Sequence, residues 1–446
     1  MRISVLVSLP SQEPLRESAA AAMERREPDI PIEAANIPQR IEIDPTFSAV
    51  PIGVSEQSSG LESLGPDTSQ DFAVRGFMDV DSPDDIPEEA NGRPIFADPL
   101  IEPFITCATT PPVGSDADVK TKLQIAQLHA KGLDGTKVAV AILDTGINVA
   151  HLQTKLGALP RHDVANSWTP PGSAVSPFKH PVGHGTMCAY DVLLAAPNAT
   201  LLDFPILAGT VPGGAMVGRT LSLALLGYAQ LLAFWAVAFA PGGGPKYSAL
   251  VVNNSWGIYH PSSDFPAGHR GRYCDNPRHP FNVVVAALAA SADIVFAAGN
   301  CGADCASSKC KSRVTETIMG ANAHPEVLTL AGCDTNDARV GYSSQGPSIA
   351  GMYQQKPDLT AYTHFLGSEA SGAGQPDTGT STACPVAAGC IAAIRTKEPA
   401  LNTPPVNLFA QLRATARVVS PAAGWNADYG HGILDAVAAA QSLGLL

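Results

Sequence analysis

Beyond residue 110, the apolar positions fall into short, mainly apolar runs, separated by longer stretches with helical spacing. A run of this kind suits a strand that is covered on both faces, because neither side of such a strand meets water. Runs of this kind occupy residues 138–143, 200–204, 250–253, 294–297 and 327–331. We therefore expect the strands of a mainly parallel, buried sheet.

Four longer apolar stretches lie between or after these runs and predict helices. They cover residues 185–194, 216–239, 281–291 and 382–395. Strands that alternate with helices indicate a doubly wound α/β fold, in which functional groups gather beyond the carboxyl ends of the strands. The expected α/β domain spans residues 111–446.

Residues 1–110 have a different pattern and predict a separate small α+β domain. Its expected elements are strands at 2–9, 72–80 and 93–96, a helix at 13–26 and a long loop at 44–71. Beyond them, the apolar residues Ile101, Phe104 and Ile105 are candidates to anchor the chain to a surface. The proline-containing residues 103–112 predict an extended linker between the domains.

Composition and charge narrow the class of protein. Hydrophobic residues make up 45% of the chain and charged residues 15%, as in soluble globular proteins. The formal net charge of −13 argues against a nucleic-acid partner, because phosphate binding needs a basic face. No small-residue cleavage site follows the apolar residues 3–9, so they do not predict a secretion signal, and a cytoplasmic location is favoured.

Three local motifs carry the residue types of acyl transfer. Asp144 directly follows the apolar run 138–143, His184 stands between two glycines at the start of a helix, and Ser381 opens another helix. Taken alone, Asp144 suits a cap or turn, His184 a structural histidine or one ligand of an incomplete metal site, and Ser381 an N-cap. Together, they suit a serine that attacks a carbonyl, a histidine that moves the proton and an aspartate that orients the imidazole.

The segment 220–240 carries no charge and is long enough to cross a bilayer. A span at this point would put His184 and Ser381 on opposite sides of the membrane. We therefore expect a buried core helix and no membrane span, since a buried helix tolerates apolar residues all round.

The motifs Asp-Thr-Gly at Asp144, His-Gly-Thr at His184 and Gly-Thr-Ser-x-x-x-Pro around Ser381 resemble the three signature motifs of the subtilase family. The resemblance covers residues 120–440. It implies a subtilisin-like fold and a serine-type endopeptidase that hydrolyses peptide bonds through an acyl-enzyme. It implies no required cofactor, and structural calcium or zinc stays open.

The resemblance also assigns residues around the triad. It implies that Asn300, in Phe-Ala-Ala-Gly-Asn, completes the oxyanion hole together with the backbone N–H of Ser381. Asn253-Asn-Ser-Trp-Gly257 resembles the strand that pairs with an extended substrate backbone. The implied substrate-binding residues are Asn254, Ser255, Trp256, Gly257 and Gly299.

The chain departs from the family pattern in places. Thr-Ala-Cys follows Ser381 where many members have Met-Ala-Ala, and the segment that begins at Lys356-Pro-Asp lacks the usual Pro-Gly. The insertions at 261–280 and 304–313 predict loops around the cleft, where specificity is tuned.

By position and size, residues 1–110 resemble a family propeptide that templates folding and blocks the cleft with its C-terminal tail. A cleavage between Cys107 and Asp116 would then release it. The competing interpretation is a permanently attached regulatory or substrate-recruiting domain. The expected partners are thus a peptide or protein substrate and the chain's own N-terminal domain.

The chain has nine cysteines, and three of them follow Asn300 closely: Cys301, Cys305 and Cys310. Zinc ligands, a disulfide that stiffens the loop and plain reduced thiols are the open alternatives, with Cys274 and Cys333 as further candidates nearby. Three other cysteines lie in apolar helical settings and predict core residues. These are Cys188, Cys384 and Cys390.

The leading function is therefore an endopeptidase. One alternative is a dedicated processing protease for a single peptide or protein partner. Another is a catalytically silent module that binds extended peptides.

Overall fold

The computed structural model describes residues 1–53, 71–107, 110–208, 219–239, 246–419 and 424–446 of the chain. Its largest sheet has six strands in the order β15-β14-β13-β11-β8-β9, and all neighbours are parallel. The strands are β8 (Val138–Leu143), β9 (Thr200–Phe204), β11 (Ala249–Asn254), β13 (Asp293–Ala297), β14 (Leu328–Cys333) and β15 (Leu359–Tyr362). All their residues are buried except the half-buried Thr200, as expected when both faces are covered.

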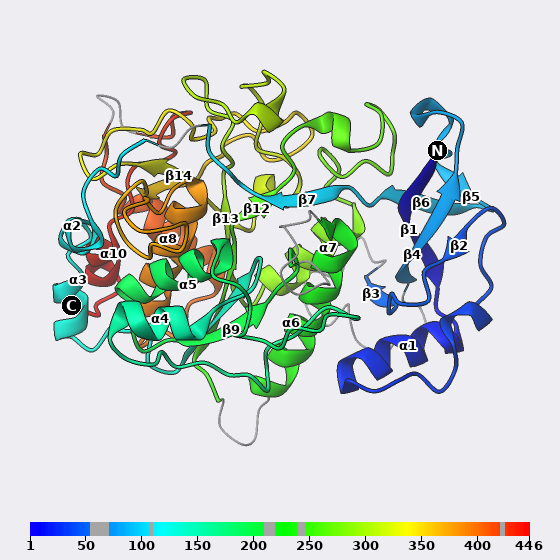
Figure 1. Cartoon of the computed structure of the whole chain (residues 1–446), viewed down its shortest axis with the longest axis horizontal. Coiled ribbons are helices and arrows are strands. Elements are labelled where there is room, and N and C mark those ends of the chain that lie inside the picture. The colour runs from blue at the N-terminus through cyan, green and yellow to red at the C-terminus, as the bar shows by residue number, and fades with distance from the viewer. Residues whose placement is uncertain (54–70, 108–109, 209–218, 240–245, 420–423) are drawn as a thin grey trace.

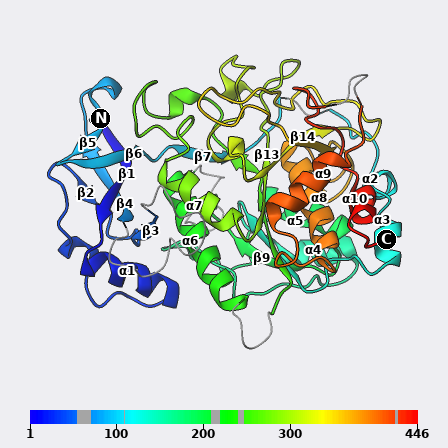
Figure 2. The ribbon, with the colours of Figure 1, turned by 180° about the vertical axis from the view of Figure 1, so that it is seen from behind.

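Helices cover both faces of this sheet (Figures 1 and 2). Alternate residues of β8 enter two different cores, because successive side chains of a strand point to opposite faces. The first core holds α2 (Asp116–Lys122), α3 (Ile125–Ala130), α4 (Val149–Leu156), α5 (His184–Ala195), α8 (Thr380–Arg395), α9 (Pro405–Ala414) and α10 (Ala436–Ser442). The second holds α6 (Leu221–Ala238) and α7 (Pro280–Ala289). The predicted doubly wound α/β fold is confirmed.

Helix α6 is the uncharged segment predicted to be a core helix. Among the described residues it is the one helix long and apolar enough to cross a membrane, and 72% of it is buried inside the protein. Its leucines pack against β8, β9 and α7. Residues 216–218 and 240 of the predicted stretches lie outside the described residues.

The N-terminal residues form a second, antiparallel sheet with the order β2-β4-β1-β6-β5, and β3 also pairs with β4. Its elements are β1 (Arg2–Pro10), α1 (Glu13–Glu24), β2 (Glu42–Ile43), β3 (Val50–Ile52), β4 (Asp71–Asp79), β5 (Glu89–Ala90) and β6 (Arg93–Ala97). One face packs on α1 in a core of its own, and the other, with Leu6 and Ala73, joins the core of α6 and α7. Residues 54–70 of the predicted long loop lie outside the described residues.

A strand that was not predicted precedes the predicted interdomain linker, whose described residues 104–107 and 110–112 lie in no helix or strand. β7 (Leu100–Pro103) is a strand, and it lies between β10 (Arg219–Thr220) and β12 (Trp256–Gly257), antiparallel to both. Figure 1 shows β7 running from the N-terminal sheet toward the larger α/β part of the molecule. Its partners come from more than 100 residues further along the chain, so local sequence does not reveal the pairing.

The two predicted insertions around the cleft are mostly irregular. They contain the short 3₁₀ turns η4 (Pro261–Ser263) and η5 (Ser308–Cys310). Further 3₁₀ turns are η1 (Ile32–Ala34), η3 (Pro83–Asp85) and η6 (Gly320–Ala323).

Candidate active site

Asp144 and His184 meet at the carboxyl edge of the central sheet. Asp144 follows the last residue of β8 and is completely buried, and His184 is the first residue of α5. The Nδ1 atom of His184 lies 2.8 Å from Oδ1 and 2.9 Å from Oδ2 of Asp144. A Cβ at position 185 would lie 2.6 Å from the carbonyl oxygen of Gly146, so only Gly185 lets α5 begin this close to the turn after Asp144.

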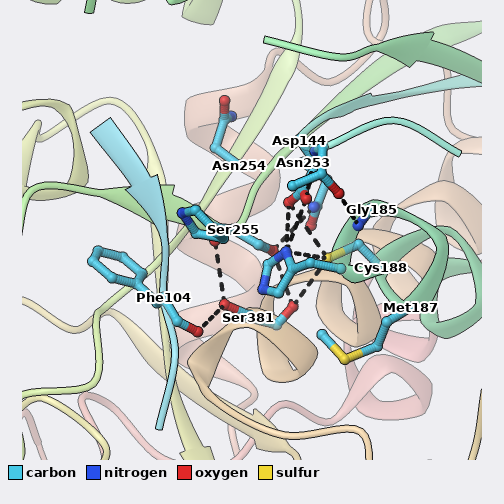
Figure 3. Close-up of polar contacts among 12 residues, drawn as sticks. Phe104, Asp144, Gly185, Met187, Cys188, Asn253, Asn254, Ser255 and Ser381 are labelled. Carbon is cyan, nitrogen blue, oxygen red and sulfur yellow. Dashed lines mark hydrogen bonds and ion pairs between the residues drawn. The ribbon is translucent and has the colours of Figure 1, made fainter. Parts of the chain in front are cut away.

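Ser381 lies in the first turn of α8, after Gly379, whose φ of +88° favours glycine. Its hydroxyl donates to the backbone carbonyls of Phe104 and Ser255, both at 3.2 Å. Figure 3 shows the Ser381 hydroxyl facing the Phe104 carbonyl. The Nε2 atom of His184 has no hydrogen-bond partner in the described part of the chain. The aspartate and histidine are therefore paired, while the serine bonds to a carbonyl in the cleft.

The predicted oxyanion residue contacts the same carbonyl. The Nδ2 of Asn300 donates to the carbonyl oxygen of Phe104 at 3.1 Å. The other end of the amide accepts from the backbone N–H and the hydroxyl of Thr380, at 3.0 and 3.1 Å, which fixes its orientation. Two donors, the Asn300 amide and the Ser381 hydroxyl, thus converge on one carbonyl oxygen.

Phe104 continues the strand β7 into the site. Its backbone N–H donates to the carbonyl of Ser255 at 3.4 Å. One strand residue before it, Pro103 pairs with Trp256. The Phe104 ring is buried beside two glycines, and a Cβ at Gly257 would lie 2.6 Å from its tip and one at Gly299 3.5 Å away.

Four of the five predicted substrate-binding residues therefore contact β7 or Phe104. Asn254 does not point there, because its Nδ2 donates to the carbonyl of Val295 inside the sheet, at 3.2 Å. The close-up shows this side chain turned away from Ser381 (Figure 3). The range predicted for cleavage, which starts at Cys107, begins three residues beyond the one whose carbonyl meets Ser381 and Asn300.

Sequence reasoning missed two side chains that hold β7 in the cleft. The hydroxyl of Tyr259 donates to the carbonyl of Pro103 at 2.9 Å and accepts from the backbone N–H of Ile105. The ammonium group of Lys309 forms an ion pair with Glu102. Both residues lie in irregular segments without a motif, so no local signal marked them.

The cysteine alternatives are resolved for three residues. Disulfides join Cys301 to Cys310 and Cys107 to Cys305, which leaves none of these thiols to bind zinc. Cys107 was not predicted as a partner because 198 residues separate it from Cys305. The other five cysteines are free and buried, as predicted for the three in helices.

One group of metal-ligand type occurs among the described residues: Asp144, His184 and Cys188, whose ligand atoms lie within 4.8 Å of one another. Burial and then the nearby Asp144 charge raise the pKa of the Cys188 thiol well above its ordinary value. The thiol is therefore protonated and sits 3.7 Å from the Asp144 carboxylate as a weak donor. A thiolate ligand is unfavourable here, so the group suits hydrogen bonding better than metal binding.

A second acid lies behind Asp144. Asp203, in β9, is completely buried and accepts from the backbone N–H groups of Phe178 and Ile147, at 2.6 and 3.3 Å. Burial raises the pKa of Asp203 to about 7, against these hydrogen bonds and with a further contribution from the Asp144 charge. His180 lies 4.0 Å away, and burial lowers its pKa to about 4. The neutral forms of both side chains are thus favoured beneath the site.

The chain is similar to known proteins over most of its length. The family model described as "Subtilase family" matches residues 135–432, well over half of the chain. Subtilisin from Bacillus pumilus is 24% identical over 330 residues, which are 72% of this chain and 97% of that protein. Subtilisin E from Bacillus subtilis (strain 168) is 24% identical over 330 residues, 72% of this chain and 70% of that protein.

Among solved structures, the crystal structure of MycP1 from Mycobacterium smegmatis is 21% identical and covers 79% of this chain and 92% of that chain, with a TM-score of 0.46. MycP1 from the ESX-1 type VII secretion system gives 21% identity, the same coverage and a TM-score of 0.47. The match of the family model over residues 135–432 establishes that this chain belongs to the subtilase family and is a subtilisin-like, serine-type endopeptidase.

Proposed function

We propose that the chain hydrolyses peptide bonds with Ser381 as nucleophile, His184 as general base and Asp144 as the residue that orients the imidazole. The bonds of Asp144 to Nδ1 of His184 support this assignment, because they leave Nε2 as the atom that takes a proton. The Asn300 amide at the carbonyl oxygen supports its role as an oxyanion donor.

The proposed reaction follows from these positions. The Ser381 oxygen attacks the carbonyl carbon, and its proton passes to Nε2 of His184. The C–N bond then breaks as His184 gives that proton to the leaving amine, which produces an acyl-enzyme. Water attacks the ester with His184 again as base and releases the acid. No metal or organic cofactor is required for any of these proton transfers.

We further propose that the enzyme is made as a zymogen and first cleaves its own Phe104–Ile105 bond. The observation that carries this proposal is the Phe104 carbonyl oxygen, which accepts from both Asn300 and Ser381. Residues 1–104 would then be the inhibitory propeptide and residues 105–446 the peptidase. After cleavage, the Cys107–Cys305 disulfide would hold the first residues of the peptidase, which begin at Ile105, next to the loop that contains Cys305.

The test compares the wild type with Ser381→Ala, and with Ser291→Ala, a serine beyond the end of α7, as the matched control. Residues 1–104 contain no cysteine, so a cleaved propeptide separates without reduction. We expect intact-mass analysis to find a cut after Phe104 in the wild type and in Ser291→Ala only. A fluorophosphonate probe should label the same two proteins.

Two results would count against the proposal, in different ways. A folded wild type that is neither cut nor labelled would reject the assigned nucleophile and favour a silent peptide-binding module. A wild type that is labelled and active but keeps residues 1–104 attached would reject the zymogen and favour a permanent regulatory domain.

A further inference from the structure

The cleft holds Glu102 of β7 by its side chain as well as by its backbone. The Glu102 carboxylate forms an ion pair with the ammonium group of Lys309, although backbone pairing with Gly257 already fixes the strand. Backbone pairing alone binds peptides with little regard to side chains. The ion pair adds recognition of charge at the second residue before the one whose carbonyl meets Ser381, which is position P3 of a bound peptide.

Lys309 is connected to the Phe104 side chain through one aromatic ring. Its ammonium group lies 5.4 Å from the centre of the Tyr259 ring, within the range of a cation–π contact. The Tyr259 ring meets the Phe104 ring edge to face, with centres 5.3 Å apart and planes at 88°. The charge at P3 and the aromatic ring at P1 are therefore bound by two touching side chains.

The loop that carries Lys309 is held close to the oxyanion residue. The disulfide joins Cys301, directly after Asn300, to Cys310, nine positions further along the chain. The backbone N–H of Ser307 donates to the Asn300 carbonyl at 3.0 Å. Lys309 lies in the 3₁₀ turn next to the buried Cys310. Because the backbone of the loop is fixed at both ends, the backbone loses little further conformational entropy when Lys309 binds a substrate carboxylate.

The other cations of this loop have different partners. The ammonium group of Lys311 donates to the Ser262 hydroxyl at 2.7 Å, and Arg313 pairs with Glu316 at 2.9 Å. In a chain with a net charge of −13, this short basic loop is a local exception. It favours acidic groups where the rest of the surface disfavours them.

We infer that this enzyme is selective for substrates with an acidic side chain at P3, which Lys309 binds, and a bulky apolar side chain at P1, as in its own sequence Glu102-Pro-Phe104. This inference rests on the proposed function of the same cleft. The preference for an acidic side chain at P3 comes from Lys309 in the insertion at 304–313. The proposed triad is the same with or without this preference.

The expected size of the preference is modest. The side chains of Lys309 and Glu102 are 37% and 34% exposed, so water and salt screen their attraction. We expect the mature wild type to cleave a peptide with Glu at P3 and Phe at P1 with a kcat/KM about two- to fivefold above that of the Gln peptide at low salt. A Lys peptide should be worse than Gln, and the differences should shrink at high salt.

The variants Lys309→Ala and Lys309→Glu test the cause, and Lys311→Ala, on the same loop, is the matched control. We expect Lys309→Ala to cleave the Glu and Gln peptides equally, Lys309→Glu to prefer the Lys peptide, and Lys311→Ala to keep the wild-type preference. Equal kcat/KM for all three peptides with the wild type would overturn the inference, as would loss of the preference in Lys311→Ala. Absence of hydrolysis of any peptide by the wild type would instead overturn the proposed function.

Self-cleavage gives a second readout in the full-length chain. Glu102→Lys should slow the appearance of the cut after Phe104, measured by intact mass over time, and Lys309→Glu in the same chain should restore most of the rate. A double variant as slow as Glu102→Lys alone would show that the two charges do not act as a pair, and would count against the inference.

Discussion

The catalytic centre and the rim of the cleft hold the same strand, β7, in different ways. The centre uses side chains placed by regular elements: Asp144 at the end of β8, His184 at the start of α5 and Ser381 at the start of α8. The rim consists of Tyr259, which lies just before the insertion 261–280, and Lys309, which lies in the insertion 304–313. In the proposed mechanism, the centre supplies the chemistry and the rim contributes to the choice of substrate. The expected effects of mutation therefore fall from the centre outwards.

The largest effect should come from the oxyanion side chain. Loss of one such donor lowers kcat about 10²- to 10³-fold, a magnitude known from the oxyanion asparagine of a subtilisin. We expect Asn300→Ala to lose activity to this extent with little change in KM, because the donor matters most when negative charge develops on the carbonyl oxygen. Steady-state kinetics on a peptide with Phe at P1 measures the loss.

The control for Asn300→Ala is its stability. The variant also leaves the backbone N–H and hydroxyl of Thr380 without their acceptor, so its unfolding midpoint must be compared with that of the wild type. A folded variant with a kcat within tenfold of the wild type would show that Asn300 is not an important oxyanion donor. The expected difference in effect between centre and rim would then be much smaller.

The buried acid next to the centre, Asp203, predicts an effect of pH on stability. The pKa of Asp203 is about 7 in the folded protein and 3.8 when unperturbed, so between these pH values the folded state holds a proton that the unfolded state has lost. Stability from this group is full below pH 3.8 and declines as the pH rises to about 7. His180, with a folded pKa of about 4 against 6.5, acts in the opposite direction and gains stability as the pH rises.

Asp203→Asn removes only the first of these two contributions. Both chains carry Ser381→Ala, which prevents self-digestion. Between pH 4 and pH 7, we expect the free energy of unfolding of the Asp203→Asn variant to rise relative to that of the chain that keeps Asp203. The relative gain should be about 2 to 4 kcal/mol, because the pKa of Asp203 is raised by about three units. Urea unfolding at several pH values measures it, and parallel curves for the two chains would mean that Asp203 is ionised in the folded state.

The same contrast explains what the sequence could predict. The strand runs and the three motifs of the centre are local patterns, so residues 138–143 and the positions of Asp144, His184 and Ser381 at element ends could be predicted from the sequence. A parallel sheet with both faces covered followed from the alternation of strands and helices, whereas the order of its strands was not predicted. Asn300 was predicted as an oxyanion residue because its segment resembles one of the family, and in the structure it lies shortly after β13.

The rim depends on contacts between distant parts of the chain, and no local sequence motif marks its residues. The strand β7 was not predicted, because its partners β10 and β12 lie far along the chain. The pairing of Cys107 with Cys305 was missed for the same reason. Asn254 was assigned to substrate by motif, but its side chain bonds within the sheet, because neighbouring residues of a strand point to opposite sides.

The smallest of these effects should come from removal of the Tyr259 hydroxyl. This change tests the hydrogen bonds of the rim without its apolar contacts. This hydroxyl bonds to the Pro103 carbonyl and accepts the N–H of Ile105, the group that leaves when the bond after Phe104 is cut. Tyr259→Phe keeps the ring against Phe104 and removes both bonds. We expect kcat/KM for an amide substrate to fall about three- to tenfold, the usual worth of such bonds, with an unchanged preference for Phe at P1. An ester of the same sequence has no leaving N–H and should lose less; an equal loss for amide and ester would show that the hydroxyl acts through Pro103 alone.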